Sequence, residues 1–201
     1  MKKYLNYFLQ GTSMKKITEK KAKNLLKKYA SNNRAFQIVL KHSLMVKKVA
    51  LSIAKEIKNN GCKVNLELIK IGALLHDIGR LVCPPDSQNS IKHGVIGGEI
   101  LRKEGLEEFA RIAETHIGAG ISKNEIKTMK LPLPHKNFIP KTIEEKIITY
   151  ADNLIIDNKL RDFEDVLKRF KKEKLPESAV KRLLRLHKEI EKLRKKHKNC
   201  F

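Results

Sequence analysis

The sequence predicts an all-helical protein. Apolar residues recur at spacings of three and four along nearly every segment, and no stretch shows the sustained alternation of a half-buried strand. The chain has 201 residues, 41% of them apolar, which is enough for one core of ordinary size. Charged residues make up 33% and are spread too evenly for a chain that is disordered throughout. We therefore expect one helical domain, alone or with an appendage.

Nine helices are expected along the chain, and their order follows from the apolar spacing. The segments are 17–30, 38–58, 66–77, 92–104, 107–117, 122–128, 142–157, 161–173 and 177–197. The second helix stops at the Asn-Asn-Gly of residues 59–61. Prolines and small polar residues predict loops at 83–90 and 131–140. Pro176 suits the first turn of the last helix, where its missing N–H costs nothing, and it separates two basic C-terminal helices.

Basic residues dominate the charge and gather toward the two ends of the chain. There are 44 Lys and Arg against 22 Asp and Glu, a formal charge of +22. Residues 1–34 carry +9, residues 35–157 only +4, and residues 158–201 again +9. This asymmetry favours an anionic partner such as RNA or a nucleotide. A solvated lysine-rich surface, or contact with the protein's own acidic face or another protein, is the open alternative.

Cysteine usage and apolar run lengths indicate the compartment. Cys62, Cys83 and Cys200 are widely spaced and form no CxxC pattern, so neither a disulfide framework nor a cysteine zinc site is expected. A reducing cytosol fits best, and we expect a cytoplasmic protein. No apolar run approaches the roughly 18 residues that cross a bilayer. Residues 1–14, with a basic tip and a short interrupted apolar stretch, are interpreted as an N-terminal extension.

Five of the expected helices each turn inward one side chain that can bind a metal. Each such residue shares its helix face with apolar residues three or four positions away. A single inward histidine is usually a hydrogen-bonded core residue, but the coincidence of five favours a shared site. The five residues are His42, His76, His93, His116 and Asp152.

Two carboxylates in apolar surroundings strengthen this interpretation. An ionised carboxylate that is buried without a partner is strongly destabilising, so Asp152 needs a cation or a dense hydrogen-bond network, and so does Asp77 beside His76. Four imidazoles and two carboxylates make a set of six ligands. Such a set suits a pair of borderline divalent metals, Mn, Fe, Co, Ni or Zn, better than Mg alone.

The stretch GALLHDIGR at residues 72–80 resembles the signature of the HD superfamily of metal-dependent phosphohydrolases, in its HDIG subgroup. His42, in Lys-His-Ser-Leu, matches the first histidine of that family, and Asp152, in Tyr-Ala-Asp, matches its terminal aspartate. His93, in Lys-His-Gly, and His116, in Glu-Thr-His-Ile-Gly, match the two further histidines of binuclear members. The chain is most similar to compact archaeal HDIG-domain proteins.

The resemblance implies an HD-domain helical bundle at residues 15–160, with residues 161–201 appended as a basic helical hairpin. It also implies that Asp77 bridges two metals, so that a water between them loses a proton near neutral pH and attacks phosphorus. The first metal would be held by His42, His76, Asp77 and Asp152, and the second by Asp77, His93 and His116.

Cations outside the ligand set are the candidates for gripping the phosphate. Arg80 stands where family members carry Lys or Arg, and a guanidinium can hold two phosphoryl oxygens at once. Lys146 and Arg161 flank the expected helix of Asp152 and are weaker candidates, with solvent-facing charge as the alternative. Three further histidines do not match the family pattern and are treated as structural or surface residues: His135, His187 and His197.

The function implied is that of a divalent-metal-dependent phosphohydrolase, with Asp77 and Arg80 as catalytic residues. Its expected substrate is a phosphomonoester or cyclic phosphodiester of a nucleotide or RNA, drawn to the site by the basic ends. Few aromatic residues lie near those ends, so charge rather than base stacking is expected to dominate binding. The alternative is a non-catalytic, nucleic-acid-associated or regulatory protein that keeps the fold and a structural metal.

Overall fold

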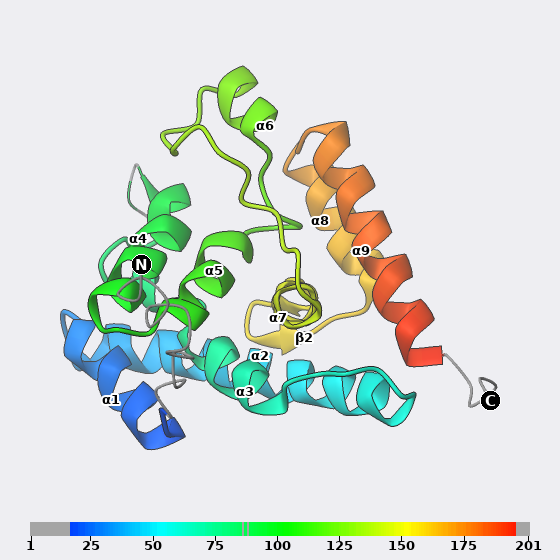
Figure 1. Cartoon of the computed structure of the whole chain (residues 1–201). Coiled ribbons are helices and arrows are strands. Elements are labelled where there is room, and N and C mark those ends of the chain that lie inside the picture. Colours follow the sequence, from blue (N-terminus) through cyan, green and yellow to red (C-terminus); the bar gives the residue numbers. More distant parts are fainter. Residues whose placement is uncertain (1–16, 86, 88, 196–201) are drawn as a thin grey trace, which may run out of the picture.

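The computed structural model describes residues 17–195 except 86 and 88, and they form a mostly helical bundle (Figure 1). The all-helical prediction is confirmed, and the extension predicted at 1–14 lies outside the described residues. No helix within the described part is long and apolar enough to cross a membrane. The helical elements are α1 (Glu19–Tyr29), α2 (Asn33–Asn59), α3 (Leu66–Leu75), η2 (Ile78–Leu81), η3 (Ser90–Lys92), α4 (His93–Lys103), α5 (Glu107–Thr115), α6 (Lys123–Thr128), α7 (Ile143–Asn153), α8 (Phe163–Lys172) and α9 (Glu177–Lys195).

The core is built around α2 and α7. Helix α2 packs against α3 and α7, while α4 packs against α5 and η2. In Figure 1, α7 is seen nearly end-on at the centre, with α2 and α3 below it, α4 and α5 on one side, and α8 and α9 on the other. Val46, Ile69, Leu74 and Ile148 are fully buried where these helices meet. Removing such aliphatic side chains from water is the main force that holds the bundle together.

Polar side chains at the helix ends fix where α5 and α7 lie. Thr142 and Glu145 form a capping box at the start of α7, in which each side chain satisfies a backbone N–H of the other. Glu145 is buried and also accepts a hydrogen bond from Arg111 of α5, with Nε and Oε1 2.8 Å apart. Glu145 therefore both caps α7 and joins it to α5, which fixes the position of these two helices relative to each other.

The helix expected at 142–157 is wrong at its C-terminal end. Helix α7 ends at Asn153, and β1 (Ile155–Ile156) pairs antiparallel with β2 (Lys159–Leu160) in a two-stranded hairpin. Asp157 and Asn158 form its turn at φ 52° and 55°. Asp and Asn tolerate this left-handed conformation, and the right-handed twist of a tight hairpin requires it.

Helix boundaries differ from expectation elsewhere, and two of the differences matter for the site. Helix α3 ends at Leu75 rather than 77, and α5 ends at Thr115 rather than 117. His76 and His116 are therefore the C-terminal cap residues of these helices instead of members of their last turns. Helix α2 begins at Asn33, five residues earlier than expected, because Asn32 caps it through its side chain.

The C-terminal hairpin of α8 and α9 is held against the bundle by polar contacts along α7 and α2. The hydroxyl of Tyr150 lies 2.7 Å from Nδ1 of His187, whose ring stacks on Phe163 at a centroid distance of 3.6 Å. At the far end of α9, Nε of Arg194 lies 2.7 Å from Oε2 of Glu56. Since α9 also buries Leu183, Leu186 and Ile190, the basic hairpin shares the core of the bundle.

Candidate metal centre

The six predicted ligands meet in one cluster, although they come from five elements. His42 lies in the middle of α2, His76 and Asp77 lie between α3 and η2, and His93 is the first residue of α4. His116 caps α5, and Asp152 lies in the last turn of α7. Ligand atoms of His42, His76 and Asp152 lie within 4.8 Å of one another, and so do those of His76, Asp77 and His116. His76 thus belongs to both groups.

Asp77 faces a different pair of histidines with each of its oxygens. Its Oδ2 lies 3.7 Å from Nε2 of His42 and 3.9 Å from Nε2 of His76. Its Oδ1 lies 3.4 Å from Nε2 of His93 and 3.3 Å from Nε2 of His116. A carboxylate placed in this way can bridge two cations.

The cluster has an open side and an enclosed side. His42 and Asp152 form the open side, where the side chains are 22% and 19% exposed and Nε2 lies 2.9 Å from Oδ1. His93 and His116 form the enclosed side, where both side chains are only 3% exposed. His76 and Asp77 lie between them. Solvent therefore reaches the cluster from the direction of α2 and α7.

Backbone carbonyls orient three of the histidines. Nδ1 of His76 donates to the Ala73 carbonyl at 2.8 Å, and Nδ1 of His116 donates to the Ala113 carbonyl at 2.7 Å. Nδ1 of His93 donates to the carbonyl of Ser90, again three residues earlier, at 2.7 Å. A carbonyl can only accept, so these bonds place the proton on Nδ1 and leave Nε2 of a neutral ring free to bind a metal.

Buried atoms in the cluster lack the partners that they need. Nε2 of His76 and Oδ1 of Asp77 are buried without any hydrogen bond. Nε2 of His93 and Nε2 of His116 face each other at 3.0 Å, although both rings carry their proton on Nδ1 when neutral. Facing lone pairs and an unpartnered carboxylate oxygen are unfavourable unless a cation or a proton lies between them. The residues therefore fit a divalent metal pair.

Electrostatic coupling keeps both carboxylates charged. Burial alone would raise the pKa of Asp77, but His76, His116 and His93 around it hold that pKa well below its usual range. Burial likewise opposes ionisation of Asp152, while the hydrogen bond to His42 and the nearby ring of His76 hold its pKa low.

The pKa values of His76 and His93 shift in opposite directions. Burial lowers the pKa of His76, but the charges of Asp77 and of Asp152, whose Oδ1 lies 3.4 Å from Nε2, outweigh it and raise that pKa to about 9. Burial and the neighbouring His116 lower the pKa of His93 to about 3. In the metal-free cluster a proton is therefore held at His76 and excluded from His93.

Arg80 is the candidate substrate residue that lies at the cluster. Its Nε is 3.7 Å from Oδ1 of Asp77, and its Nη1 donates to the Ser90 carbonyl at 3.3 Å. The Arg80 side chain is 25% exposed, so solvent reaches it beside the carboxylate of Asp77.

The weaker substrate candidates lie farther along α7 and the hairpin. Nζ of Lys146 pairs with Glu189 of α9 at 2.7 Å, and Arg161 is exposed directly after β2. Their roles as substrate residues stay predictions. His135 is exposed in the loop after α6, His187 packs on Phe163, and His197 lies outside the described residues.

Asn153 is a supporting residue that the sequence reasoning missed. It is 2% exposed, and its Nδ2 donates to the carbonyls of Gly118 and Thr149 while Oδ1 accepts from Nη2 of Arg169 at 2.9 Å. Because Asn153 follows Asp152 and Gly118 lies two residues after His116, its side chain ties the open side to the enclosed side. An amide next to an aspartate in an otherwise apolar run was the available signal.

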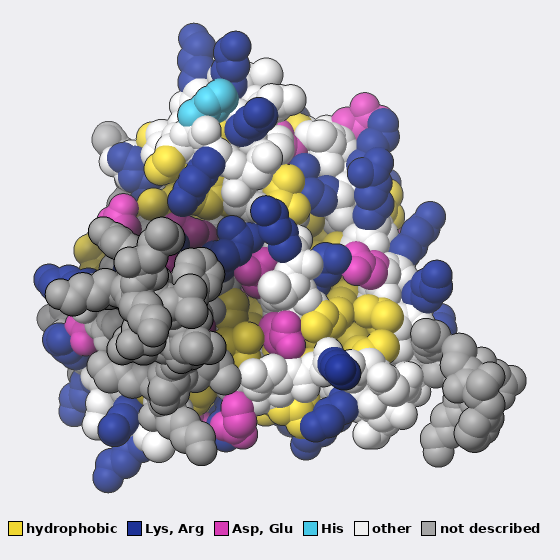
Figure 2. Space-filling view, viewed as in Figure 1, with side chains coloured by type: hydrophobic (Ala, Val, Ile, Leu, Met, Phe, Trp, Pro, Cys, Tyr) yellow, Lys and Arg dark blue, Asp and Glu magenta, His cyan; other side chains and the backbone are white. Residues whose placement is uncertain are grey.

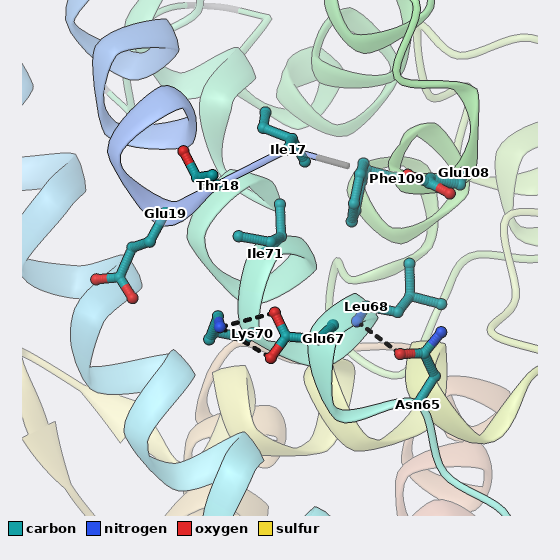
Figure 3. A pocket seen from close by; sticks show the side chains of 10 residues that line it. All are labelled: Ile17, Thr18, Glu19, Asn65, Glu67, Leu68, Lys70, Ile71, Glu108 and Phe109. Carbon is teal, nitrogen blue, oxygen red and sulfur yellow. Dashed lines mark hydrogen bonds and ion pairs between the residues drawn. The ribbon is translucent and has the colours of Figure 1, made fainter. Parts of the chain in front are cut away.

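Two larger cavities lie away from the cluster. One of about 580 Å³ lies between α1, α3 and α5, and Glu19, Glu67 and Glu108 are among its lining residues (Figure 3). The other, of about 830 Å³, lies between α2, α7 and α9 and includes Arg161 and His187. Neither cavity is lined by any of the six clustered residues. The cluster, rather than the volume of a cavity, therefore marks the candidate site.

Family comparison agrees with this geometry. The sequence model of the HD domain matches residues 39–157, which include all six clustered residues. The chain belongs to the HD domain family. It is 44% identical over 178 residues to an uncharacterized protein of Methanocaldococcus jannaschii, covering 87% of this chain and 98% of that protein. The HD domain of the L. monocytogenes phosphodiesterase PgpH has the same fold, with a TM-score of 0.50 at 19% identity over 81% of this chain and 94% of that one.

Other relatives of this HD domain protein are longer chains, and only a part of each is similar to it. The tRNA (cytidine(56)-2'-O)-methyltransferase of Thermoplasma volcanium is 40% identical over 82% of this chain, which spans only 44% of that enzyme. Ribonuclease Y of Fusobacterium nucleatum is 41% identical over 72 residues, which are 36% of this chain and 13% of that protein. Segments similar to this chain thus occur within longer proteins whose names refer to RNA.

Proposed function

We propose that the protein is a divalent-metal-dependent phosphohydrolase that hydrolyses a phosphomonoester or cyclic phosphodiester of a nucleotide or RNA at a binuclear site. The observation that carries the proposal is the two-sided placement of Asp77, with Oδ2 toward His42 and His76 and Oδ1 toward His93 and His116. A carboxylate that served only as a buried ion-pair partner would need histidines on one side alone.

The chain's own residues would hold the two metals in distinct ways. His42, His76, Asp152 and Oδ2 of Asp77 offer one set of donors, and His93, His116 and Oδ1 of Asp77 offer the other. Mixed imidazole and carboxylate donors suit Mn, Fe, Co, Ni or Zn better than Mg alone. When bound, such metals supply a nucleophilic water near neutral pH and neutralise the phosphoryl oxygens.

Arg80 would orient the phosphate. Its bond to the Ser90 carbonyl and its proximity to Asp77 hold the guanidinium beside the cluster, and its remaining N–H groups can donate to phosphoryl oxygens. Exposure of His42 and Asp152 leaves the approach from the open side free for the phosphate. We assign the reaction to the HD domain at residues 15–160 and a supporting role to residues 161–201.

Two observations support a nucleotide or RNA as the substrate. The chain carries a formal charge of +22, which raises the local concentration of a polyanion around a metal centre. Its relatives include proteins named tRNA (cytidine(56)-2'-O)-methyltransferase and Ribonuclease Y.

The first of those relatives also favours a second candidate function, in which the HD domain binds RNA without hydrolysing it. In that protein the segment similar to this chain accompanies a different activity, and a metal would then serve the fold alone. The two candidates differ in what the loss of Asp77 does.

Metal analysis and the variant Asp77→Asn test the proposal. The wild-type protein is expected to hold about two metals per chain and to release phosphate, or open a cyclic phosphodiester, in a screen of nucleotides and short RNAs with Mn, Co, Ni and Mg. D77N keeps the shape of the side chain but loses its charge, so both metals should bind more weakly. Hydrolysis should fall about 10³-fold, which is about 4 kcal/mol of activation barrier.

The thermal transition of D77N separates loss of chemistry from loss of fold. Glu107→Gln, which removes the charge of an exposed carboxylate paired with Arg102, is the matched control for expression and folding. Metal-dependent turnover that is equal in D77N and the wild type would eliminate the enzyme proposal. RNA binding without turnover in the wild type would favour the second candidate.

A further inference from the structure

A small apolar cavity adjoins the enclosed side of the metal centre. It has a volume of about 120 Å³ and lies where the chain after α6 and the turn between α8 and α9 approach the segment after His116. Ile91 and Ile117 line it, together with Met129, Leu175 and Ala179. Ile91 is two residues before His93, and Ile117 directly follows His116, so the backbone that carries both enclosed ligands also forms a wall of the cavity.

The charged groups in the cavity wall are already satisfied. Nη2 of Arg182 lies 2.7 Å from Oε2 of Glu125 and 2.8 Å from the Gly120 carbonyl oxygen, and the hydroxyl of Ser178 also donates to Glu125. Burial works against ionisation of Glu125, but these donors lower its pKa to about 2, so the pair stays charged and closed. The remaining wall is largely aliphatic and includes one aromatic ring, that of Phe170. Such a wall fits a flat, uncharged ring better than an ion.

The size of the cavity also fits a ring. A water needs about 10–15 Å³ of such volume, so the cavity has room for about eight to twelve non-hydrogen atoms. A nucleobase has about that number. Burial between aliphatic side chains and the Phe170 ring would hold the base without reading its hydrogen-bonding edge.

Three lysines stand directly beside lining residues of the cavity. Lys92 follows Ile91, Lys130 follows Met129, and Lys174 precedes Leu175. Within the described part of the chain none of the three forms an ion pair with a carboxylate. Figure 2 shows Lys and Arg side chains projecting from the surface over α6 and the loop that follows it.

The backbone at two of these lysines is strained. Lys130 and Lys174 both have φ of 51°, each two residues past the end of a helix, where glycine is the usual residue. The other non-glycine residues with positive φ in the described part are Asp157 and Asn158, whose hairpin turn accounts for them. At both lysines this conformation closes the helix end: the N–H of Leu131 donates to the Ile126 carbonyl at 2.9 Å, and the N–H of Leu175 donates to the Phe170 carbonyl at 3.2 Å. Glycine adopts the same conformation with less strain, so the two charges can be removed without disturbing these helix ends.

We propose that this cavity receives one nucleobase of a single-stranded RNA, whose flanking phosphates lie on Lys92, Lys130 and Lys174. These three lysines, which each adjoin a lining residue and are called the rim below, call for several phosphates, which a polynucleotide offers and a free mononucleotide does not. The proposal rests on the proposed function and deepens it, because it names the substrate as RNA and places its nucleoside part beside His93 and His116.

The double variant Lys130→Gly/Lys174→Gly tests the rim. Glycine relieves the left-handed strain, so this variant should unfold at a temperature no lower than the wild type while losing two charges. The probe is a fluorescent RNA hexamer with phosphorothioate linkages, which resist hydrolysis, bound to the metal-loaded protein across a salt series. The slope of log affinity against log salt should decrease by about 1.4, since each phosphate contact on a single strand contributes about 0.7.

The matched control is Lys27→Ala/Lys55→Ala, which removes two exposed charges from α1 and α2, at the opposite end of the view in Figure 1. It should leave the slope of the wild type unchanged. An equal change of slope in both double variants, or no change in either, overturns the rim assignment, because binding would then follow total charge or avoid this surface.

Abasic scanning tests the cavity. Replacing the bases of the hexamer one at a time by abasic positions should weaken binding about 5- to 150-fold at one position, which is the usual range for a stacked or buried base. Ala179→Leu fills the cavity and should remove this penalty, whereas Val180→Leu, on the same helix but not lining the cavity, should keep it.

The outcomes separate this inference from the proposed function. If no abasic position matters, or if the penalty is the same in A179L and V180L, the base pocket is wrong even where phosphate is released. If the penalty is found but no substrate is hydrolysed with any metal, the proposed function fails and the RNA pocket remains.

Discussion

The open side of the candidate metal centre pairs an imidazole with a carboxylate, the enclosed side pairs two imidazoles, and the two sides also differ in how far their ligands are oriented in advance. His93 and His116 are 3% exposed, and each donates its Nδ1 proton to a carbonyl three residues earlier. On the open side, His42 and Asp152 are 22% and 19% exposed and bond mainly to each other. The enclosed side is therefore preorganised for a metal, while the open side must give up its own hydrogen bond to receive one.

Under the proposed function, this difference would give the two sides separate tasks. A preorganised, water-excluded pair of imidazoles binds a metal tightly and releases it slowly, because the ligands lose little freedom on binding. A solvent-reached pair lets water and phosphate approach. The shared residues His76 and Asp77 link the two tasks, and Asn153 ties the backbones behind them.

Removing one ligand from each side should produce the largest effects. His116→Ala should lose the enclosed metal, and His42→Ala should lose the open one, so each variant should retain about one metal per chain. In the wild type, a chelator should remove one metal at least about tenfold faster than the other, and the fast one should be missing from H42A. Metal analysis against time of dialysis provides the measurement. Equal release rates in the wild type would contradict the distinction between the sides.

Both sides of the cluster were readable from the sequence because helical periodicity is a local property. Spacing alone placed one inward residue on each of five helices, and the family resemblance divided these residues and Asp77 into two ligand sets. Spacing could not show that His76 and His116 cap their helices. The end of a helix is set by its backbone hydrogen bonds, and any residue except proline can make or lack such a bond.

Contacts that join distant segments were beyond the sequence reasoning. The strand at Ile155 and Ile156 was predicted as the end of the helix at 142–157, since these residues continue an apolar spacing that strands and helices share over short runs. The bond between Asn153 and Arg169 joins two helices whose relative placement no periodicity states.

The pH dependence of metal binding should sharpen the difference between His76 and His93. In the metal-free protein the pKa of His76 is about 9, so below that pH a metal must displace its proton, while His93, with a pKa of about 3, carries none above pH 5. Affinity should therefore rise up to about tenfold per pH unit between pH 7 and 9, with close to one proton released. Titration calorimetry in buffers of different ionisation enthalpy measures that proton.

The stability of the metal-free protein should change with the opposite sign. Because the folded-state pKa of His76 lies above the unfolded value of 6.5, its contribution is complete below about pH 6.5 and is lost as pH rises through about 9. His135→Asn, which changes an exposed histidine outside the cluster, should leave both profiles unchanged. Metal affinity that stays flat from pH 7 to 9 would show that His76 carries no proton to displace.

The smallest expected effects distinguish two residues of α7 that both reach the C-terminal hairpin. Asn153→Ala removes the side-chain hydrogen bonds to Arg169 and to the Gly118 and Thr149 carbonyls, which should cost about 1–3 kcal/mol of stability and weaken metal binding about tenfold by freeing the backbone behind Asp152. Tyr150→Phe removes only the bond to His187, about 1 kcal/mol at most, and should leave metal affinity unchanged. Urea unfolding of the metal-free proteins gives the free energy of unfolding, and competition with a chromophoric chelator gives the metal affinity.

If both variants weaken metal binding equally, docking of the hairpin as a whole supports the centre. A selective effect of N153A would instead place the link between the open and enclosed sides in that one amide.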